Sequence, residues 1–179
     1  RRIDIMAIVN LTDDAFYSGS RCFGKDGSPD GLSLAARIGN MIAEGADIID
    51  LGACSTRPGS EPVPAEEEWR RLLPALDIVA QEFPRTRIDT FRPEIGSRAF
   101  DKMGRFIVND VSGGCGEMWR TVGSLGLPYV AMHTRGTPKE MQSLTDYPDV
   151  TAAVVEFFED IEDTAEKYGV SEWILDPGF

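Results

Sequence analysis

The chain has 179 residues, of which 42% are hydrophobic and 27% are charged, a composition typical of one soluble globular domain. Its formal net charge of −12 argues against a nucleic-acid backbone or an anionic membrane as partner. No stretch is apolar enough to span a membrane and no signal-peptide pattern opens the chain, so the sequence predicts neither feature.

The thiols and the imidazole restrict the chemistry further. The three cysteines are Cys22, Cys54 and Cys115, and none is at CxxC spacing from another. Their odd number predicts reduced thiols and a cytoplasmic protein. The single histidine, His133, excludes sites built from several histidines, and it fits a structural role as well as a functional one.

Strands and helices are predicted to alternate along the whole chain. Short apolar runs predict strands at 3–9, 48–51, 86–89, 106–108, 128–132 and 173–175. Apolar residues at helical spacing predict helices near 34–42, 64–83, 93–102, 117–124 and 150–168. A capping-box pattern at 137–140 predicts a short helical turn. This alternation is typical of a parallel α/β sheet, either doubly wound or a (β/α)8 barrel.

Polar residues stand where the apolar strands run out. They are Asn10, Asp50, Asp89, Asn109, His133 after Met132, and Asp176. A barrel gathers the carboxyl ends of its strands around one mouth, and no GxGxxG follows the first strand. We therefore expect an α/β fold of the TIM (β/α)8 barrel type. It is an incomplete one of about six βα units, because a full barrel takes about 250 residues.

The loop after the second strand, 55–59, reads Ser-Thr-Arg-Pro-Gly. Its backbone N–H groups and the Arg57 guanidinium suit an anion. The glycine-rich stretch 113–116 could also cradle a phosphate. The acids and amides at the strand ends could bind a metal, run acid–base chemistry or read the donor edge of a heterocycle, and the residues alone leave these alternatives open.

From its first strand to its sixth the chain resembles the dihydropteroate synthase family. The matching motifs lie in order at 5–12, 45–50, 55–59, 88–90, 107–114, 132–138 and 175–178. The resemblance implies a pterin-binding barrel of folate biosynthesis. Such an enzyme is a transferase that joins 6-hydroxymethyl-7,8-dihydropterin diphosphate to p-aminobenzoate, giving 7,8-dihydropteroate and diphosphate with Mg²⁺ present. A homodimer is compatible with it.

The resemblance also implies roles for the residues that bind the pterin. Asp89, Asn109 and Asp176 would hold the pterin deep in the barrel. Met132 would lie against its ring.

A second group of implied roles concerns the remaining ligands. Asn10 would help to hold Mg²⁺ and diphosphate, and Arg57 would contact the anionic groups, so these two are the implied catalytic residues. Thr56 and Pro58 would border the p-aminobenzoate site. Phe16 would help to close the first loop over the substrates.

The sequence departs from the family pattern at several points. Asp13 and Ala15 stand where Pro and Ser are usual, Cys54 where Glu is usual, and Thr134 where Met is common. The seventh-strand Lys of the family, which contacts the pterin, has no counterpart among the 179 residues. Nor do its eighth-strand Arg and His. The domain, 1–179, is therefore expected to lack the last two βα units, which leaves open the activity of the chain by itself.

Two other functions remain in view. One is the pterin- or folate-binding domain of a methyltransferase, against which the 55–59 loop argues, because a diphosphate-handling loop has no task there. The other is an inactive truncated paralogue that binds pterin or nothing, which the missing strands and the altered loop residues favour.

Overall fold

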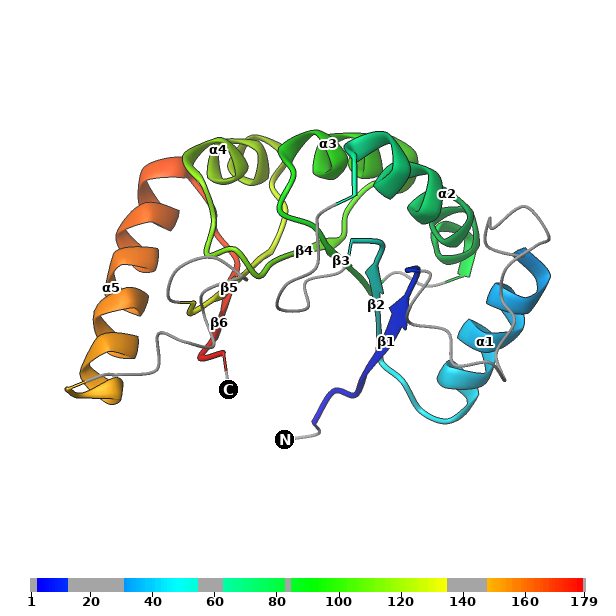
Figure 1. Ribbon diagram of the computed structural model, residues 1–179, viewed down its shortest axis with the longest axis horizontal. Coiled ribbons are helices and arrows are strands. Elements are labelled where there is room, and N and C mark those ends of the chain that lie inside the picture. The colour runs from blue at the N-terminus through cyan, green and yellow to red at the C-terminus, as the bar shows by residue number, and fades with distance from the viewer. Residues whose placement is uncertain (1–2, 13–30, 55–62, 83–84, 135–147, 179) are drawn as a thin grey trace.

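The computed structural model describes residues 3–12, 31–54, 63–82, 85–134 and 148–178 of the chain. Within them the backbone forms one parallel sheet of six strands (Figure 1). The strands are β1 (Met6–Asn10), β2 (Ile48–Gly52), β3 (Thr86–Asp89), β4 (Ile107–Asp110), β5 (Tyr129–Met132) and β6 (Trp173–Asp176).

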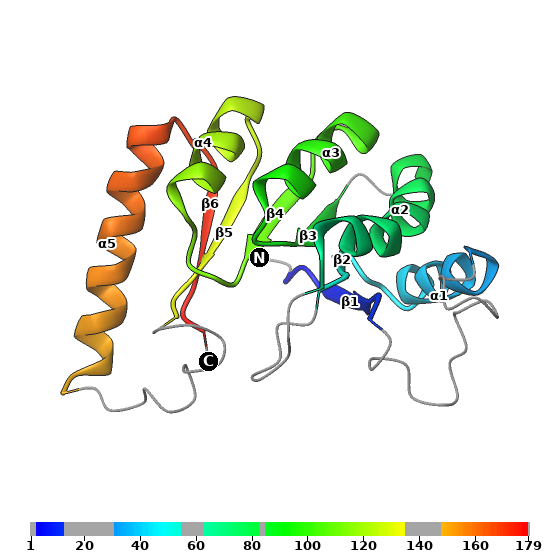
Figure 2. The same cartoon turned by 45° about the horizontal axis from the view of Figure 1, so that its top comes forward.

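A helix lies in the chain between each strand and the next. The helices are α1 (Gly31–Ala43), α2 (Ala65–Glu82), α3 (Pro93–Met103), α4 (Gly116–Leu125) and α5 (Val150–Tyr168). They form an arc along one side of the sheet, and α1 to α5 follow one another around it (Figures 1 and 2). Among the described helices, none is long and apolar enough to cross a membrane.

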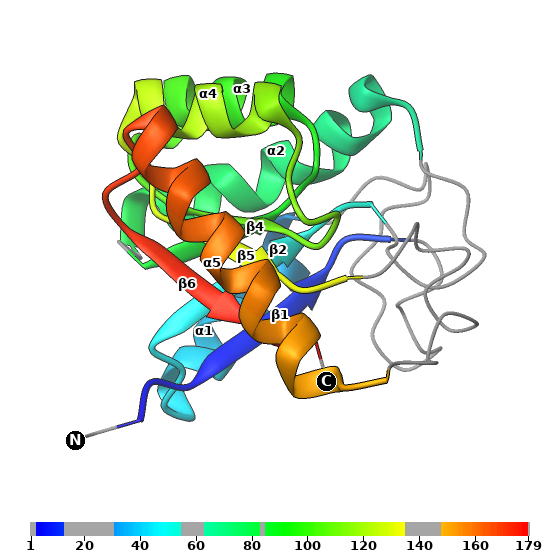
Figure 3. The same cartoon turned by 90° about the vertical axis from the view of Figure 1, so that its left-hand side faces the viewer.

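The strand order separates the two predicted architectures. The strands lie side by side in chain order, β1 to β6, whereas a doubly wound sheet reverses its order at a switch point. The sheet curves, and the helices lie on its outer, convex side (Figure 1). Figure 3 shows the same arrangement from the side of α5, with this helix in front of the strands. The barrel-type fold is therefore confirmed. Within the described residues, β1 pairs with β2 and β6 pairs with β5, and the two end strands do not close the sheet.

The predicted ends of two strands are wrong. Asp50 is the middle residue of β2, which continues to Gly52, because this part of β2 pairs with both β1 and β3. The strand β4 likewise continues through Asn109 to Asp110 by pairing with β5. The helical turn predicted at 137–140 lies outside the described residues.

Period-two alternation gives the sheet two different faces. Strand residues such as Leu51, Ile88 and Val108 have no exposed surface, and they belong to the core between sheet and helices. Helix α2 completes this core with Leu72, Leu76 and Val79, spaced as one helical face requires. The intervening strand residues therefore point to the concave face, where the polar side chains gather.

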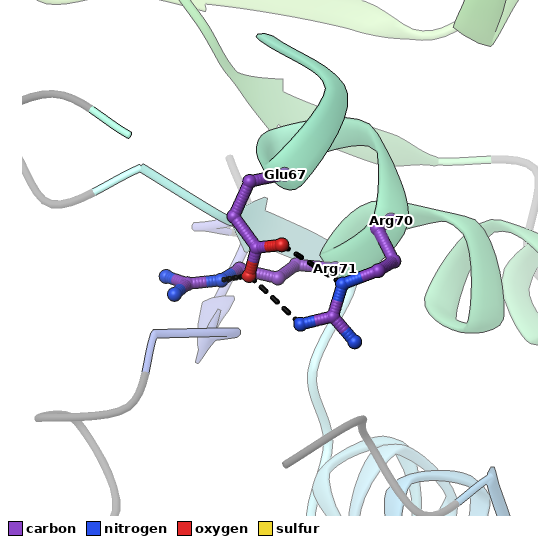
Figure 4. A network of polar contacts seen from close by, with 3 residues as sticks. All are labelled: Glu67, Arg70 and Arg71. Carbon is purple, nitrogen blue, oxygen red and sulfur yellow. Dashed lines mark hydrogen bonds and ion pairs between the residues drawn. The ribbon is translucent and has the colours of Figure 1, made fainter. Parts of the chain in front are cut away.

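The acidic start of α2 forms structural ion pairs. Glu67 accepts hydrogen bonds from Arg70 Nε at 2.8 Å and from Arg71 Nε at 2.7 Å (Figure 4). These bonds lower the pKa of Glu67 to about 2. Glu66 pairs with Arg98, and the acids also lie in the first turn, where the helix dipole favours negative charge.

Close packing of α4 against the end of α5 makes a first prediction possible. A methyl group on Gly123 of α4 would overlap the backbone carbonyl of Tyr168. Gly123→Ala is therefore expected to destabilise the protein by about 1–3 kcal/mol, as other overpacked sites do. Urea unfolding measures this. Gly39→Ala on α1 is the matched control, because its methyl group meets nothing within 4 Å and Ala is the better helix former. Equal effects of the two substitutions would contradict the packing.

Candidate pterin site at the strand ends

The carboxyl ends of four neighbouring strands bring the predicted polar residues into one row. Asn10 is in register with Gly52, Gly52 with Asp89, and Asp89 with Asn109. Their strand neighbours Val9, Leu51, Ile88 and Val108 face the helices, so this row lies on the concave face. The sheet thus brings together Asn10, Asp89 and Asn109, which are far apart in the sequence.

Gly52 leaves space in the middle of this row. A methyl group there would lie 3.6 Å from Asn10 Oδ1 and 3.7 Å from Asp89 Oδ2. Both side chains therefore lean over the glycine from opposite sides. Any larger residue would occupy the space between them, which is where a planar ligand could reach both polar groups.

The pKa of the Asp89 carboxyl group is raised well above its usual value. Loss of surrounding water, which is the largest cause, and the neighbouring carboxylate of Asp50 raise its pKa to about 7, whereas the Arg87 guanidinium lowers it. Asp110 and Glu68 add smaller upward contributions. At neutral pH the group is therefore close to half protonated, so it can change between hydrogen-bond donor and acceptor.

Asn109 carries an unused hydrogen-bond acceptor. Its side chain is buried, with 3% of the residue exposed, and within the described structure its Oδ1 atom has no hydrogen-bond partner. Buried polar atoms without a hydrogen-bond partner are uncommon, because an unpaired acceptor costs free energy of folding. A ligand with a donor at this depth would satisfy it.

The strands β5 and β6 contribute a second pair of predicted residues. Met132 is in register with Asp176, and both are half-buried. Asp176 Oδ1 accepts a hydrogen bond of 2.9 Å from the Gly178 backbone N–H, so this carboxylate also shapes the turn that follows it. The ring of His133 meets that of Phe157 edge-on at 5.2 Å, which supports its structural interpretation.

The remaining predicted residues, Arg57, Thr56, Pro58 and Phe16, lie outside the described residues. So do Asp13 and Ala15 of the first loop. Both flanks of the second loop are described.

These flanks are held by a buried network. Arg92 Nη2 donates to the Val63 carbonyl at 2.6 Å, and its Nη1 donates to Glu68, which is fully buried. Thr90 Oγ1 donates to the same carboxylate at 2.6 Å. Cys54 lies beside Arg92, and burial raises the pKa of its thiol, so it is unsuited to act as a nucleophile.

The glycine-rich stretch has a packing explanation. The backbone of Gly114 has a φ of +82°, and a methyl group there would meet Tyr129 Oη and Trp119 Nε1 at 2.5 and 2.6 Å. Tyr129 in turn donates to the buried Asp110 at 3.1 Å. The turn and the two rings are thus enough to require glycine at position 114, and a bound phosphate is not needed to explain it.

Several residues of this region were not predicted to belong to the site. Gly52 matters only because its two strand neighbours carry polar side chains. Arg87 was predicted only as part of a short strand. In the structure its Nε atom lies 3.4 Å from Oδ1 of Asp50 on the concave face. The alternation of side chains along β3 places Arg87 and Asp89 on one face, which is the signal that could have found it.

Comparison with known sequences identifies the family of the chain. The chain matches the family described as "Pterin binding enzyme" over residues 6–179. It is 41% identical over 181 residues to the folic acid synthesis protein fol1 of Pneumocystis carinii, covering 97% of this chain and 23% of that protein. It is 37% identical over 183 residues to the dihydropteroate synthase of Escherichia coli, covering 98% of this chain and 61% of that one.

Solved structures give the same result. A dihydropteroate synthase of Thermus thermophilus in complex with 4-aminobenzoate is 36% identical, with a TM-score of 0.80 over 99% of this chain and 62% of that chain. The Yersinia pestis enzyme with a sulfonamide drug is 30% identical, with a TM-score of 0.85 over 99% and 64%. The chain thus spans less than two thirds of the length of these relatives. Over the part that it spans, it belongs to the family of pterin binding enzymes.

Proposed function

We propose that the chain supplies the pterin site of a dihydropteroate synthase. The complete enzyme would join 6-hydroxymethyl-7,8-dihydropterin diphosphate to p-aminobenzoate and release diphosphate. The observation that carries the proposal is the row of Asn10, Gly52, Asp89 and Asn109 at the strand ends. The names of the relatives, and the 4-aminobenzoate bound in one of them, support the same reaction.

The chemistry of the row suits a pterin. An amino-pyrimidinone edge offers adjacent N–H donors, whose hydrogen bonds the carboxyl oxygens of Asp89 and Asp176 can accept. The free Oδ1 of Asn109 would take a further donor, and Gly52 places no side chain between Asn10 and Asp89. Met132, beside Asp176 in register, would pack against the ring. We propose Asp89, Asn109, Asp176 and Met132 as the pterin-binding residues.

The donor set also fits Mg²⁺, with the ion held largely by the substrate. In the described residues no group of three or more His, Cys, Asp or Glu could hold a metal ion. Asn10 offers one amide oxygen at the strand ends, and Mg²⁺ is commonly bound by one or two protein oxygens together with substrate phosphates and waters. Asn10 would therefore contribute a single ligand. The ion would stabilise the negative charge on the departing diphosphate.

The second loop completes the proposal. Arg57 would contact anionic groups of the substrates, Thr56 and Pro58 would border p-aminobenzoate, and Phe16 would cover the site. Loss of diphosphate leaves a cationic methylene on the pterin, which the arylamine attacks, so positive charge near the leaving group favours the reaction. We propose a cytoplasmic homodimer, in which each subunit adds two βα units to the six strands described.

Pterin binding by calorimetry tests the proposal. Asp89→Asn and Asp176→Asn are each expected to weaken binding more than Arg57→Ala does, because both acids lie on the sheet, whereas the sequence predicts Arg57 on a loop. Loss of a charged partner of a buried donor costs about 1–3 kcal/mol. Asp77→Asn, on the exposed side of α2, is the control and should bind normally. A wild-type chain that binds no pterin, or equal weakening by Arg57→Ala, would contradict the proposal.

A further inference from the structure

A buried ion pair lies directly below the proposed pterin site. Asp50 on β2 and Arg87 on β3 are in register, and the Asp50 residue is only 6% exposed. Arg87 Nε is 3.4 Å from Asp50 Oδ1, and Arg87 Nη1 lies 3.2 Å from the sulfur of Met6 on β1. The guanidinium therefore extends across β2 along the concave face.

This pair is held by charge rather than by good hydrogen-bond geometry. Within the described structure neither Arg87 Nε nor Asp50 Oδ1 has a hydrogen-bond partner, although the two atoms are close. The negative charge of Asp50 is consequently offset by a neighbour and not by a tightly bound donor. Burial raises the pKa of Asp50, and Arg87 lowers it.

The pair adjoins Asp89 in two directions. Along β3, Asp89 is the next concave-face residue after Arg87, and along β2, Gly52 is the next after Asp50. Because Gly52 has no side chain, nothing of β2 separates the pair from the Asp89 carboxyl group. Asn10 lies beyond Gly52 on β1.

The other charged groups near Asp89 come from two elements. Asp110 is on β4, where its carboxylate bonds to Ser112 and Tyr129. Glu68 is on α2 and is paired with Arg92. Both already have partners on the helix side, whereas Asp50 and Arg87 share the concave face with Asp89.

We propose that Asp50 and Arg87 are positioning residues that set the charge of Asp89, and with it the pH range in which the site accepts a ligand edge with two donors. Arg87 favours the ionised carboxylate and Asp50 opposes it. The charge-setting role concerns this chain alone, while its effect on ligand binding rests on the proposed function. Residues that serve only for packing would not have opposite effects on the ionisation of Asp89.

Carboxyl ¹³C NMR of the 179-residue chain tests the role without a ligand. Asp89→Asn identifies the Asp89 resonance, and its titration midpoint is then compared among variants. Arg87→Met should raise the midpoint by about 1 unit, and Asp50→Asn should lower it by a similar amount, because each removes one charge next to Asp89 on the concave face. Arg87→Lys should restore the wild-type midpoint, and combining Arg87→Met with Asp50→Asn should nearly cancel the two shifts.

Arg85→Met is the matched control. It makes the same chemical change on the same stretch of chain, but Arg85 is half exposed and pairs with Asp4 at 2.7 Å, so the midpoint of Asp89 should not move. Shifts of the same sign in the two single variants, or no shift in either, would overturn the proposal. If Arg87→Met does not fold, Arg87→Gln and the double variant provide the same comparison.

Pterin affinity measured against pH supplies the second readout. Arg87→Met should move the onset of binding to higher pH and Asp50→Asn to lower pH, whereas a purely structural role predicts equal weakening at every pH. If the midpoints move as expected but the wild-type chain binds no pterin, the charge-setting role stands and the proposed function fails. If pterin binds but the midpoints do not move, the proposed function stands and the charge-setting role fails.

Discussion

The 179-residue chain alone is expected to give little or no dihydropteroate. A fusion that continues it with the part of the Escherichia coli dihydropteroate synthase beyond the matched segment is expected to be active. The reason lies in the ends of the sheet. Strands β1 and β6 each pair on one side only within the described residues. Ile8 on β1 is 53% exposed and Ile174 on β6 is 51% exposed, so both end strands present apolar side chains on the concave face.

Open strand edges and exposed apolar residues favour association between chains. The fusion would add two βα units between β1 and β6, which buries these residues and removes both edges. It would also bring the Lys, Arg and His that the family carries there. Each donor to a developing charge is commonly worth about 10²–10³ in rate, so the fusion is expected to turn over far faster than the 179-residue chain.

The measurement is p-aminobenzoate-dependent synthesis, together with the association state by light scattering. The fusion carrying Asp89→Asn is the control, since it should be monodisperse but bind pterin weakly. An ordinary enzymatic rate from the 179-residue chain alone would contradict this expectation. So would a fusion that is monodisperse, binds pterin and still shows no turnover.

Replacing Asp89 with Asn should stabilise the protein at alkaline pH. Its pKa in the folded protein is raised from 3.8 to about 7, so between these values the folded state binds more protons than the unfolded chain. Stability from this group is therefore fully present below about pH 4, and it is lost as the pH rises to about 7. One pKa unit corresponds to about 1.4 kcal/mol, which makes the full loss about 4 kcal/mol.

Urea unfolding at pH 4 and pH 8 measures this difference. Asp89→Asn cannot ionise, so its advantage over the wild type should approach about 4 kcal/mol at pH 8 and nearly vanish at pH 4. Asp77→Asn on the surface of α2 controls for the loss of a carboxylate. An advantage of the same size at both pH values would show that Asp89 is not the group responsible. A stabilised variant with weakened pterin binding would also indicate that this carboxylate is kept for the ligand at the expense of the fold.

The order of the elements and most of the polar row follow from the sequence alone. Apolar runs of four or five residues separated by amphipathic helices are typical of a parallel α/β sheet, and the residues that end such runs meet at one edge. Asn10, Asp89, Asn109 and Asp176 could therefore be named as site residues from the chain itself. The start of α2 also follows from the sequence, because its first-turn acids, Glu66, Glu67 and Glu68, suit the positive end of the helix dipole.

How these residues act on one another depends on the folded sheet. The strands β2 and β4 extend to Gly52 and Asp110 because they pair with neighbouring strands. The sequence pattern does not show this pairing, and it therefore wrongly predicted Asp50 at the end of β2. The contact of Arg87 with Asp50, and the space over Gly52 between Asn10 and Asp89, join strands that are tens of residues apart in the chain. Such contacts are set by the register of the sheet, which no local pattern encodes. The charge of Asp89 depends on the same register, because it is the sum of burial and of fields from neighbouring strands.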